Sequence, residues 1–350
     1  MPAIAIADAL RERHAEVSFL GTRDRAEADL VPAAGYEIDF LDVRGLDRRN
    51  PLRAVRALGL AAAAVPAAGR LLGERQAEVV MGGGGYVAGP AGLAALRRDL
   101  PLVLTEADSH LGLTNRLLAG RARRVCLAFP IPGREGGPYV VTGRPVPRSV
   151  ISADRDAARA RFGIGDGRCL LVFGGSLGAR SVNEAAFTSF AGSGSDRGFH
   201  VLHVAGRRDY PELKRRFDAT APPDYTLLEY EPGLGDALAA CDLVLARAGG
   251  SVFEIAAAGR PALLVPYPHA TGDHQTSNAA WMAEAGAARI IADSSLTADR
   301  LASEVSELLG DDERLKAMAS ASRSIAKPDA ADRIADEILK ATGAKGEAPA

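Results

Sequence analysis

The sequence predicts an α/β protein with two doubly wound domains, each built on a parallel sheet covered by helices. Three observations lead to this fold class. Helical and strand patterns alternate along the whole chain. The apolar runs are short and lack polar alternation, which is typical of strands that are covered on both faces. The 350 residues exceed the size of one ordinary core, so two domains are expected.

In the first half, expected helices and strands alternate from the first residues onward. The expected elements are a helix over Pro2–Arg13, a strand over Val17–Gly21, a long helical stretch, a strand and glycine run over Glu78–Gly85, a helix over Ala88–Arg98 and a strand over Pro101–Asp108. The segment Thr142–Arg148 reads TGRPVPR, and its two prolines indicate a linker. We therefore place a first domain at 1–147.

The second half restarts the same pattern. Cys169–Arg180 reads as a strand, a glycine loop and a helix start, and the buried run Leu243–Leu245 ends at a glycine pair before another helix. Pro328 interrupts the last helical region. We place the second domain at 148–342, and leave open whether its last helix crosses back to the first. Residues 343–350 are poor in apolar side chains and are expected to be disordered.

The composition excludes several classes of function. The net charge of −2 argues against a general nucleic-acid binder. The three cysteines have neither metal nor redox spacing, so we expect buried thiols in a reducing cytoplasm. Asp154 and Asp156 form a D-x-D pattern that some transferases use for a metal–diphosphate, but they lie at an expected helix start, where acids favour the dipole. We therefore expect no metal and no other cofactor.

The most informative segment is Arg247–Asn278. Its glycine pair precedes a helix that starts at Ser251 and carries Glu254 in its first turn, a layout that offers backbone N–H groups to a phosphate and a carboxylate to sugar hydroxyls. The alternative is an S-x-x-E capping box, which needs no ligand and has equal weight on these residues alone. Polar side chains crowd the loop and helix start after Pro268, namely His269, Asp273, His274, Gln275 and Asn278. Function concentrates in such loops, so a nucleotide or nucleotide-sugar site is favoured.

A glycine loop adds to this interpretation. Phe173–Arg180 follows a buried strand, so Gly174, Gly175 and Gly178 allow the backbone to approach a ligand, and Ser176 can donate to a phosphate oxygen. The loop matches neither a Walker loop nor the dinucleotide fingerprint. A tight turn without a ligand is the weaker alternative.

The first half carries a matching loop and two other candidate features. Tyr86 lies at the tip of Gly82–Pro90, where it could stack on a sugar. Glu106 and Asp108 follow a strand and suggest contacts to sugar hydroxyls, with solvated loop acids as an equally weighted alternative. The apolar stretch Arg53–Arg70 is flanked by arginines and would suit an anionic membrane face. Composition alone slightly favours an alanine-rich helix packed on a sheet.

These motifs resemble the peptidoglycan glycosyltransferases of glycosyltransferase family 28. The likeness covers nearly the whole chain, through the opening segment and LGTRDRAEADLVPAAGYEIDF, GGYVAGPAGLAA, GLTNRLLA and FGGSLGAR. It implies a GT-B fold, with two Rossmann-like domains facing a cleft. It also implies inverting transfer of GlcNAc from UDP-GlcNAc to the MurNAc 4-hydroxyl of lipid I, undecaprenyl-pyrophosphoryl-MurNAc-pentapeptide, forming lipid II. The enzyme would be peripheral, on the cytoplasmic face of the bacterial cell membrane.

The resemblance assigns the donor to the second half. Ser176 would contact the diphosphate or the acetamide, Glu231 would bind uracil through its backbone, and Gln275 would contact the GlcNAc hydroxyls. The other donor residues would frame the ribose and diphosphate; they are Arg148, Gly175, Gly178, Gly250, Ser251, Val252, Phe253 and Glu254. The acceptor side would be lined by Tyr86, Glu106, Asp108 and Asn115. Arg53–Arg70 matches the family's membrane-association region, which strengthens that interpretation.

Two departures from the family pattern affect single residues. Pro147 stands at the position of a strand-end arginine, with Arg148 next to it and Arg144 at the position of an asparagine. The family's His-Glu-Gln-Asn segment reads Thr-Glu-Ala-Asp over 105–108, which keeps Glu106 and replaces the asparagine with Asp108.

The third departure affects the start of the chain. The family's opening strand and Gly-Gly-Thr-Gly-Gly-His loop are absent, because Pro2 aligns with the proline that follows them. We expect the native protein to extend upstream of Met1. The base that inversion requires is unassigned, with Glu106 and Asp108 as candidates. Two alternatives stay open: another GT-B glycolipid or natural-product glycosyltransferase or UDP-GlcNAc epimerase, and a nucleotide-sugar-binding protein that does not catalyse.

Overall fold

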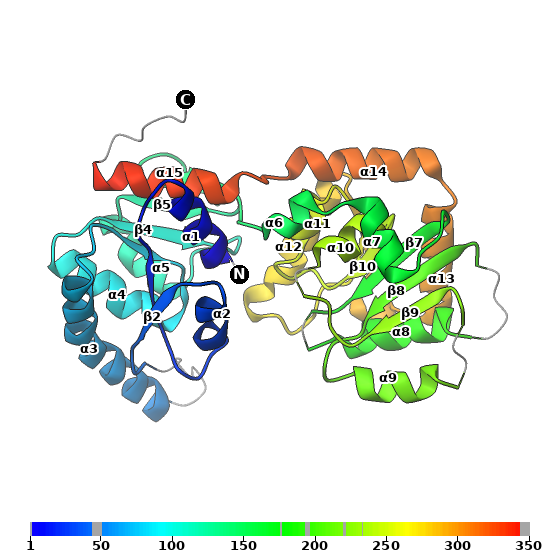
Figure 1. Cartoon of the computed structure of the whole chain (residues 1–350), viewed down its shortest axis with the longest axis horizontal. Helices are drawn as coiled ribbons and strands as arrows, with labels where there is room; N and C mark the ends of the chain where they lie inside the picture. The colour runs from blue at the N-terminus through cyan, green and yellow to red at the C-terminus, as the bar shows by residue number, and fades with distance from the viewer. Residues whose placement is uncertain are drawn as a thin grey trace. The chain divides into compact units, whose positions relative to one another are not determined.

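The computed structural model describes residues 2–43, 51–175, 177–192, 197–219, 222–232 and 234–343, which form two compact units. The first comprises Met1–Pro145 with Asp329–Ala350, and the second comprises Val146–Pro328. The division after Pro145 lies within the segment that suggested a linker. The second unit ends at Pro328 rather than at residue 342, because the last helix packs in the first unit (Figure 1). From residue 344 onward, the predicted tail lies outside the described residues.

The first unit alternates helices with parallel strands. Its elements are α1 (Pro2–Glu12), β1 (Ser18–Gly21), α2 (Glu27–Ala33), β2 (Glu37–Phe40), α3 (Pro51–Glu74), β3 (Val80–Gly82), α4 (Gly85–Arg97), β4 (Leu102–Glu106), α5 (Leu113–Leu118), β5 (Arg124–Leu127), β6 (Tyr139–Val141) and α15 (Ala330–Thr342). The strands form two parallel sheets, one of order β1-β2 and one of order β3-β4-β5-β6. None of the helices in the described residues is long and apolar enough to cross a membrane.

Helix α4 begins earlier than the sequence predicted. Its first residue is Gly85 rather than Ala88. Gly84 and Gly85 have φ angles of +80° and +76°, a region that side chains disfavour, so these glycines turn the chain from β3 into the helix. Tyr86 therefore lies in the first turn of α4 and not at a loop tip.

Helix α15 completes the core of the first unit from the far end of the sequence. Ile334 and Ile338 are buried and pack in one cluster with Ile6 of α1. Arg13 forms an ion pair with Asp332 at 3.0 Å, at the edge of the same contact. The apolar stripe of α15 is therefore buried within the first unit, which explains why the predicted boundary at residue 342 differs from the structure.

The second unit is a doubly wound sheet with helices on both faces. Its elements are α6 (Arg148–Ser152), α7 (Arg155–Phe162), β7 (Arg168–Phe173), α8 (Arg180–Phe190), β8 (Phe199–Val204), α9 (Tyr210–Phe217), β9 (Tyr225–Leu228), α10 (Gly235–Ala240), β10 (Leu243–Ala246), α11 (Val252–Ala257), β11 (Ala262–Leu264), α12 (His274–Glu284), β12 (Ala288–Ile290), α13 (Ala298–Leu309) and α14 (Asp312–Ile325). All strands are parallel, in the order β12-β11-β10-β7-β8-β9. Leu170–Val172 and Leu243–Leu245 are fully buried, as their apolar runs predicted.

The packing of α15 leads to a prediction about stability. Ile338→Ala should lower the free energy of unfolding by about 2–5 kcal/mol, because it opens a cavity in the α1–α15 cluster. Urea unfolding followed by circular dichroism measures this change. Leu30→Ala, at a side chain that is 42% exposed in the same unit, is the control and should change stability much less. Equal losses in both variants would contradict the assigned role of α15.

Candidate functional site

The strand order of the second unit places two predicted ligand loops next to each other. β7 and β10 are hydrogen-bonded neighbours with Phe173 opposite Ala246, and the sheet is extended in opposite directions from this pair. In open α/β sheets, ligands bind outside the carboxyl ends of the strands at such a switch point. The residues that follow these two strand ends are Gly174–Gly178 and Arg247–Glu254. The structure therefore brings together the two segments that the sequence marked as a nucleotide site.

The glycines after β7 are required by backbone packing as well as by any ligand. Gly175 and Gly178 have φ angles of +97° and +90°. A Cβ on Gly178 would overlap the carbonyl oxygen of Ala205, and one on Gly206 would overlap the backbone of Gly178. The loop thus lies directly on the backbone that follows β8. Ser176, the predicted phosphate contact, lies outside the described residues.

A buried polar network lies beneath this loop, and sequence reasoning missed it. Asn183 Nδ2 donates to Ala205 O at 2.8 Å and to Asp209 Oδ2 at 3.0 Å. His203 Nε2 is 3.0 Å from Asn183 Oδ1, and its Nδ1 is 2.6 Å from the Tyr225 hydroxyl. Burial lowers the pKa of His203 to about 3. The ring therefore stays neutral, donates to the amide oxygen and accepts from the phenol.

The segment after β10 does not form the capping box that was the alternative to a ligand site. Ser251 has helical dihedral angles, φ −64° and ψ −13°, and its side chain makes no cap hydrogen bond. Val252 and Phe253 are buried, and the Phe253 ring packs on Trp281 with centroids 5.1 Å apart. The side chains of these two residues therefore support the site from within the core and do not line it. Gly250, Ser251 and Glu254 are half-exposed.

Two amides of α12 approach the same segment. Gln275 Oε1 accepts from the backbone N–H of Tyr267 at 2.9 Å. Its Nε2 lies 4.0 Å from the point where a Cβ on Gly249 would be. Asn278 is buried and donates to Ala248 O at 3.0 Å. Gln275 is thus beside the glycine pair, as its predicted role in the same ligand site requires.

The two remaining donor residues are placed differently. The carboxylate of Glu231 is buried and bound by both terminal nitrogens of Arg161, at 2.7 and 2.8 Å. This pairing raises the pKa of Arg161, chiefly through the hydrogen bond to Glu231. The side chain of Glu231 is therefore occupied, which agrees with a role limited to its backbone. Arg148 is exposed and is the first residue of α6.

In the first unit, Glu106 organises the loop that follows β4. One carboxylate oxygen accepts from the backbone N–H groups of Ala107 and Asp108, at 3.0 and 3.2 Å. The other accepts from Gly112 N at 2.8 Å and from Asn115 Nδ2 at 2.9 Å. The side chain of Glu106 thus holds this loop together. Asp108 is half-exposed and is the more available of the two candidate bases.

Tyr86 and the D-x-D pattern can also be placed. Tyr86 is 45% exposed, and the guanidinium carbon of Arg25 is 5.6 Å from its ring centroid. Asp154 caps α7 by accepting from Ala157 N at 2.8 Å, which is the role that its position predicted. Within the described residues, no three His, Cys, Asp or Glu side chains are grouped so that they could hold a metal ion.

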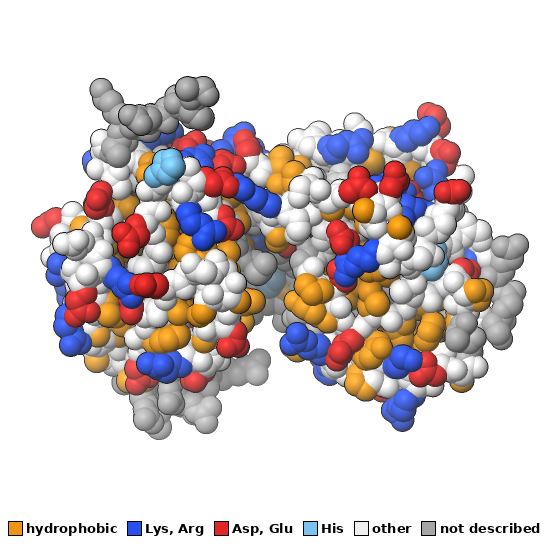
Figure 2. All heavy atoms as spheres, viewed as in Figure 1, with side chains coloured by type: hydrophobic (Ala, Val, Ile, Leu, Met, Phe, Trp, Pro, Cys, Tyr) orange, Lys and Arg blue, Asp and Glu red, His pale blue; other side chains and the backbone are white. Residues whose placement is uncertain are grey.

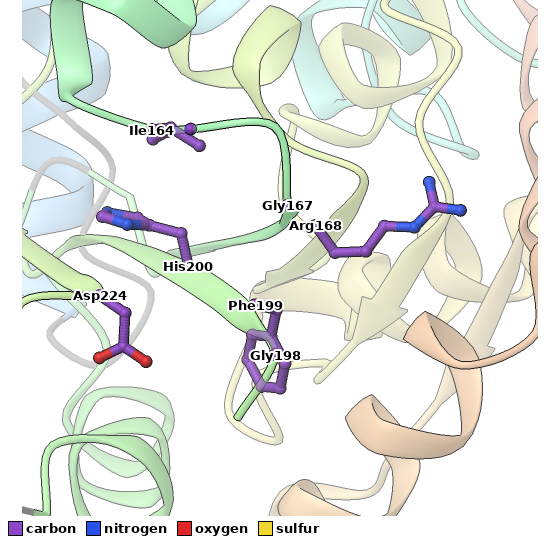
Figure 3. Close-up of a pocket in the computed structure, with 8 residues that line it drawn as sticks. Ile164, Gly167, Arg168, Gly198, Phe199, His200 and Asp224 are labelled. Atoms are coloured by element: carbon purple, nitrogen blue, oxygen red, sulfur yellow. The ribbon is translucent and has the colours of Figure 1, made fainter. Parts of the chain in front are cut away.

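A surface pocket occurs at the opposite edge of the sheet, around the amino ends of β7, β8 and β9 (Figure 3). Its polar residues have partners within the fold. His200 Nε2 is 2.8 Å from Thr226 Oγ1, and burial lowers the pKa of His200. Arg168 points away from His200 and Asp224 (Figure 3). It forms an ion pair with Asp242. This pocket is therefore separate from the switch-point site.

Comparisons with known proteins identify the family. Models of the N-terminal and the C-terminal domain of glycosyltransferase family 28 match residues 1–127 and 169–334. The chain is 40% identical over 353 residues to a protein of Moorella thermoacetica, with 97% of this chain and 95% of that protein covered. It is 41% identical over 347 residues to one of Salinibacter ruber, with 97% and 92% covered. Both are named UDP-N-acetylglucosamine--N-acetylmuramyl-(pentapeptide) pyrophosphoryl-undecaprenol N-acetylglucosamine transferase.

Solved structures agree with this assignment. The crystal structure of Acinetobacter baumannii MurG matches with a TM-score of 0.76 and 30% identity, covering 97% of this chain and 95% of that one. A putative UDP-N-acetylglucosamine 2-epimerase from Listeria monocytogenes matches with a TM-score of 0.68 at 16% identity, which shows a shared fold alone. The two α/β units are those of the GT-B fold, as predicted. The chain belongs to glycosyltransferase family 28.

Proposed function

We propose that this chain is an N-acetylglucosaminyltransferase of peptidoglycan synthesis, which transfers GlcNAc from UDP-GlcNAc to the MurNAc 4-hydroxyl of lipid I and forms lipid II with inversion. The observation that carries the proposal is near-full-length identity of about 40% to relatives named for this transfer. The switch-point site of the second unit supports it, because a nucleotide-binding site is expected where these loops meet.

In this proposal the second unit binds the donor. Backbone N–H groups of the Gly174–Gly178 loop and the start of α8 bind the diphosphate, since amides at such a position favour an anion. Glu254 accepts hydrogen bonds from the ribose hydroxyls. The amide of Gln275, which lies beside Gly249, contacts the sugar. No metal is needed for this binding, because the amides act on the leaving diphosphate as its charge develops.

The first unit supplies the acceptor side. An inverting displacement needs a base that removes the proton of the attacking hydroxyl. Glu106 already accepts four hydrogen bonds, so we assign it the positioning of the 107–112 loop. Asp108, held by its backbone in that loop, is the candidate base. Tyr86 and Asn115 complete the acceptor side in this assignment.

The direct test measures transfer of labelled GlcNAc from UDP-GlcNAc to a lipid I analogue. We expect a lipid II analogue, and no transfer to diacylglycerol and no epimerised UDP-sugar. Asp108→Asn should lower kcat about 100-fold or more, because proton removal is lost, with little change in the KM for UDP-GlcNAc. Asp29→Asn, at an exposed site on α2, is the matched control. Transfer to another acceptor alone would reject the lipid I assignment, and unchanged kcat in Asp108→Asn would reject the base.

The ribose assignment makes a separate prediction. Glu254→Gln should weaken UDP binding roughly tenfold, because a charged acceptor of two hydroxyls becomes a neutral one. Isothermal titration with UDP measures this without any acceptor. Glu284→Gln, at an exposed position at the end of α12, should bind like the parent chain. Equal affinity in all three proteins would remove Glu254 from the site.

We further propose that the protein is peripheral on the cytoplasmic face of the membrane, and that the first unit provides the contact. Ala64, Val65 and Ala68 of α3 are buried in a cluster with α4, so this face of the predicted Arg53–Arg70 region packs internally. The neighbouring helices α4 and α5 expose large apolar side chains. Leu93 of α4 and Leu117 of α5 are 39% and 72% exposed.

Basic side chains accompany these leucines. Arg97 of α4 and Arg116 of α5 are exposed, as is Arg70 of α3. Leucine inserted at the headgroup boundary and arginine beside anionic lipids would together hold the unit on the membrane surface.

The face of the chain in Figure 2 has acidic and basic side chains interspersed, which is unlike a nucleic-acid-binding surface.

Vesicle binding checks the membrane proposal. Leu117→Asp should weaken binding to phosphatidylglycerol-containing vesicles roughly tenfold or more, because it removes one leucine that would insert into the membrane and adds repulsion from the anionic lipids. Sedimentation with vesicles of stated composition gives the bound fraction. Ile151→Asp, at a side chain that is 48% exposed in the second unit, is the control. If both variants bind as the parent chain does, the surface of α4 and α5 is not the contact.

A further inference from the structure

Arg247 connects several strand ends of the second unit without facing solvent. It follows β10 directly, and its side chain is only 11% exposed. One terminal nitrogen donates to the carbonyls of Val265 and Pro266, at 3.1 and 3.2 Å, just after β11. The other donates to Ser181 Oγ at 2.7 Å, in the first turn of α8. Three segments of the proposed donor site are thus held by one guanidinium.

The charge of Arg247 is balanced within the same cluster. Asp293, after β12, pairs with Arg247 at 2.7 Å and accepts from Ser181 Oγ at 2.6 Å. Burial tends to raise the pKa of Asp293, but hydrogen bonds from Ser181 and Arg247 lower it below its ordinary value. The pair is therefore charged and complete at neutral pH. A planar, five-donor group suits this position, since a lysine could not reach all these acceptors at once.

The carbonyls that Arg247 holds lead directly to the proposed sugar contact. The residue after them is Tyr267, whose ring centroid is 5.4 Å from the guanidinium carbon. The backbone N–H of Tyr267 donates to Gln275 Oε1 at 2.9 Å. Because the amide oxygen is occupied by this bond, the amide nitrogen of Gln275 is the group directed to the side of Gly249.

We propose that Arg247 is a positioning residue for recognition of the donor sugar. By holding the backbone at Val265 and Pro266, it places the Tyr267 N–H, which orients the Gln275 amide so that its NH₂ group donates to a sugar hydroxyl oxygen. Arg247 itself touches no ligand. This inference rests on the proposed function, because the contact between Gln275 and GlcNAc is assigned there.

This role of Arg247 predicts that a substitution weakens binding of the sugar more than binding of the nucleotide. Arg247→Lys keeps the positive charge beside Asp293 but cannot bridge both carbonyls and Ser181. Isothermal titration with UDP-GlcNAc and with UDP measures both affinities. The affinity ratio is the affinity for UDP-GlcNAc divided by the affinity for UDP. We expect this ratio to fall roughly tenfold in Arg247→Lys, as for loss of an oriented sugar contact. A merely structural role would weaken both ligands equally and leave the ratio unchanged, which would overturn the proposal.

A double-variant cycle tests whether Arg247 acts through Gln275. Gln275→Ala should lower the ratio by itself, and adding Arg247→Lys to it should lower the ratio little further. Additive losses would overturn the proposed relay, in which Arg247 acts through Tyr267 on Gln275. Arg289→Lys is the matched control, because Arg289 pairs with Glu304 at 2.6 Å on the last strand of the sheet and contacts none of these groups.

A second variant covers the case in which Arg247→Lys does not fold. Gln275→Glu keeps an oxygen for the Tyr267 N–H but replaces the NH₂ donor with another acceptor, so the ratio should again fall roughly tenfold. An unchanged ratio would overturn the assigned orientation of the amide. If the parent chain binds neither UDP nor UDP-GlcNAc, the proposed function fails first, and that result is distinct from a failure of the Arg247 relay.

Discussion

The pairing of β10 with β7 is the constraint on which the second unit's site depends. Since the chain adds strands on one side of β7 and then returns to the other, the connections after β7 and β10 leave the sheet edge in opposite directions. The proposed donor site lies between them, where backbone N–H groups from both connections are available to a ligand. The glycines of the first loop have a second role in this arrangement, because Gly178 must also accommodate the carbonyl oxygen of Ala205. A side chain there would displace the loop before it met a ligand.

Sequence patterns were informative where a signal is local. The apolar runs of β7 and β10, the glycine loops that follow them and the polar start of α12 could all be predicted, because short-range spacing determines them. The supporting clusters could not. Ser181 and Asp293 are hydrogen-bonded although they are 112 residues apart in the sequence, and Asn183 and His203 are hydrogen-bonded at a separation of 20 residues. No periodicity marks such pairs, since each residue alone resembles an ordinary polar side chain. The return of α15 to the first unit had only Pro328 as a local signal.

Three glutamates illustrate why residue type alone does not define a role. Glu231 is paired with Arg161, Glu106 accepts from backbone N–H groups and Asn115, and Glu254 is half-exposed beside a glycine pair. Glu106 ends a strand, Glu231 follows one and Glu254 lies in the first turn of a helix after one, so their sequence contexts are similar. Partners at a distance commit the carboxylates of Glu231 and Glu106 to the fold. The same reasoning separates Ser251 from a true cap: the motif was present, but the serine backbone is already helical and its side chain makes no cap hydrogen bond.

The return of α15 also has a consequence for synthesis of the chain. Residues 146–328 are contiguous, so the second unit can complete its core as soon as they have left the ribosome. The first unit cannot, because Ile334 and Ile338 belong to the cluster that covers Ile6. Its amino-terminal elements must therefore wait, with that apolar face partly uncovered, until α15 has been made. Of the two units, the one whose translation begins first is the one that finishes folding last.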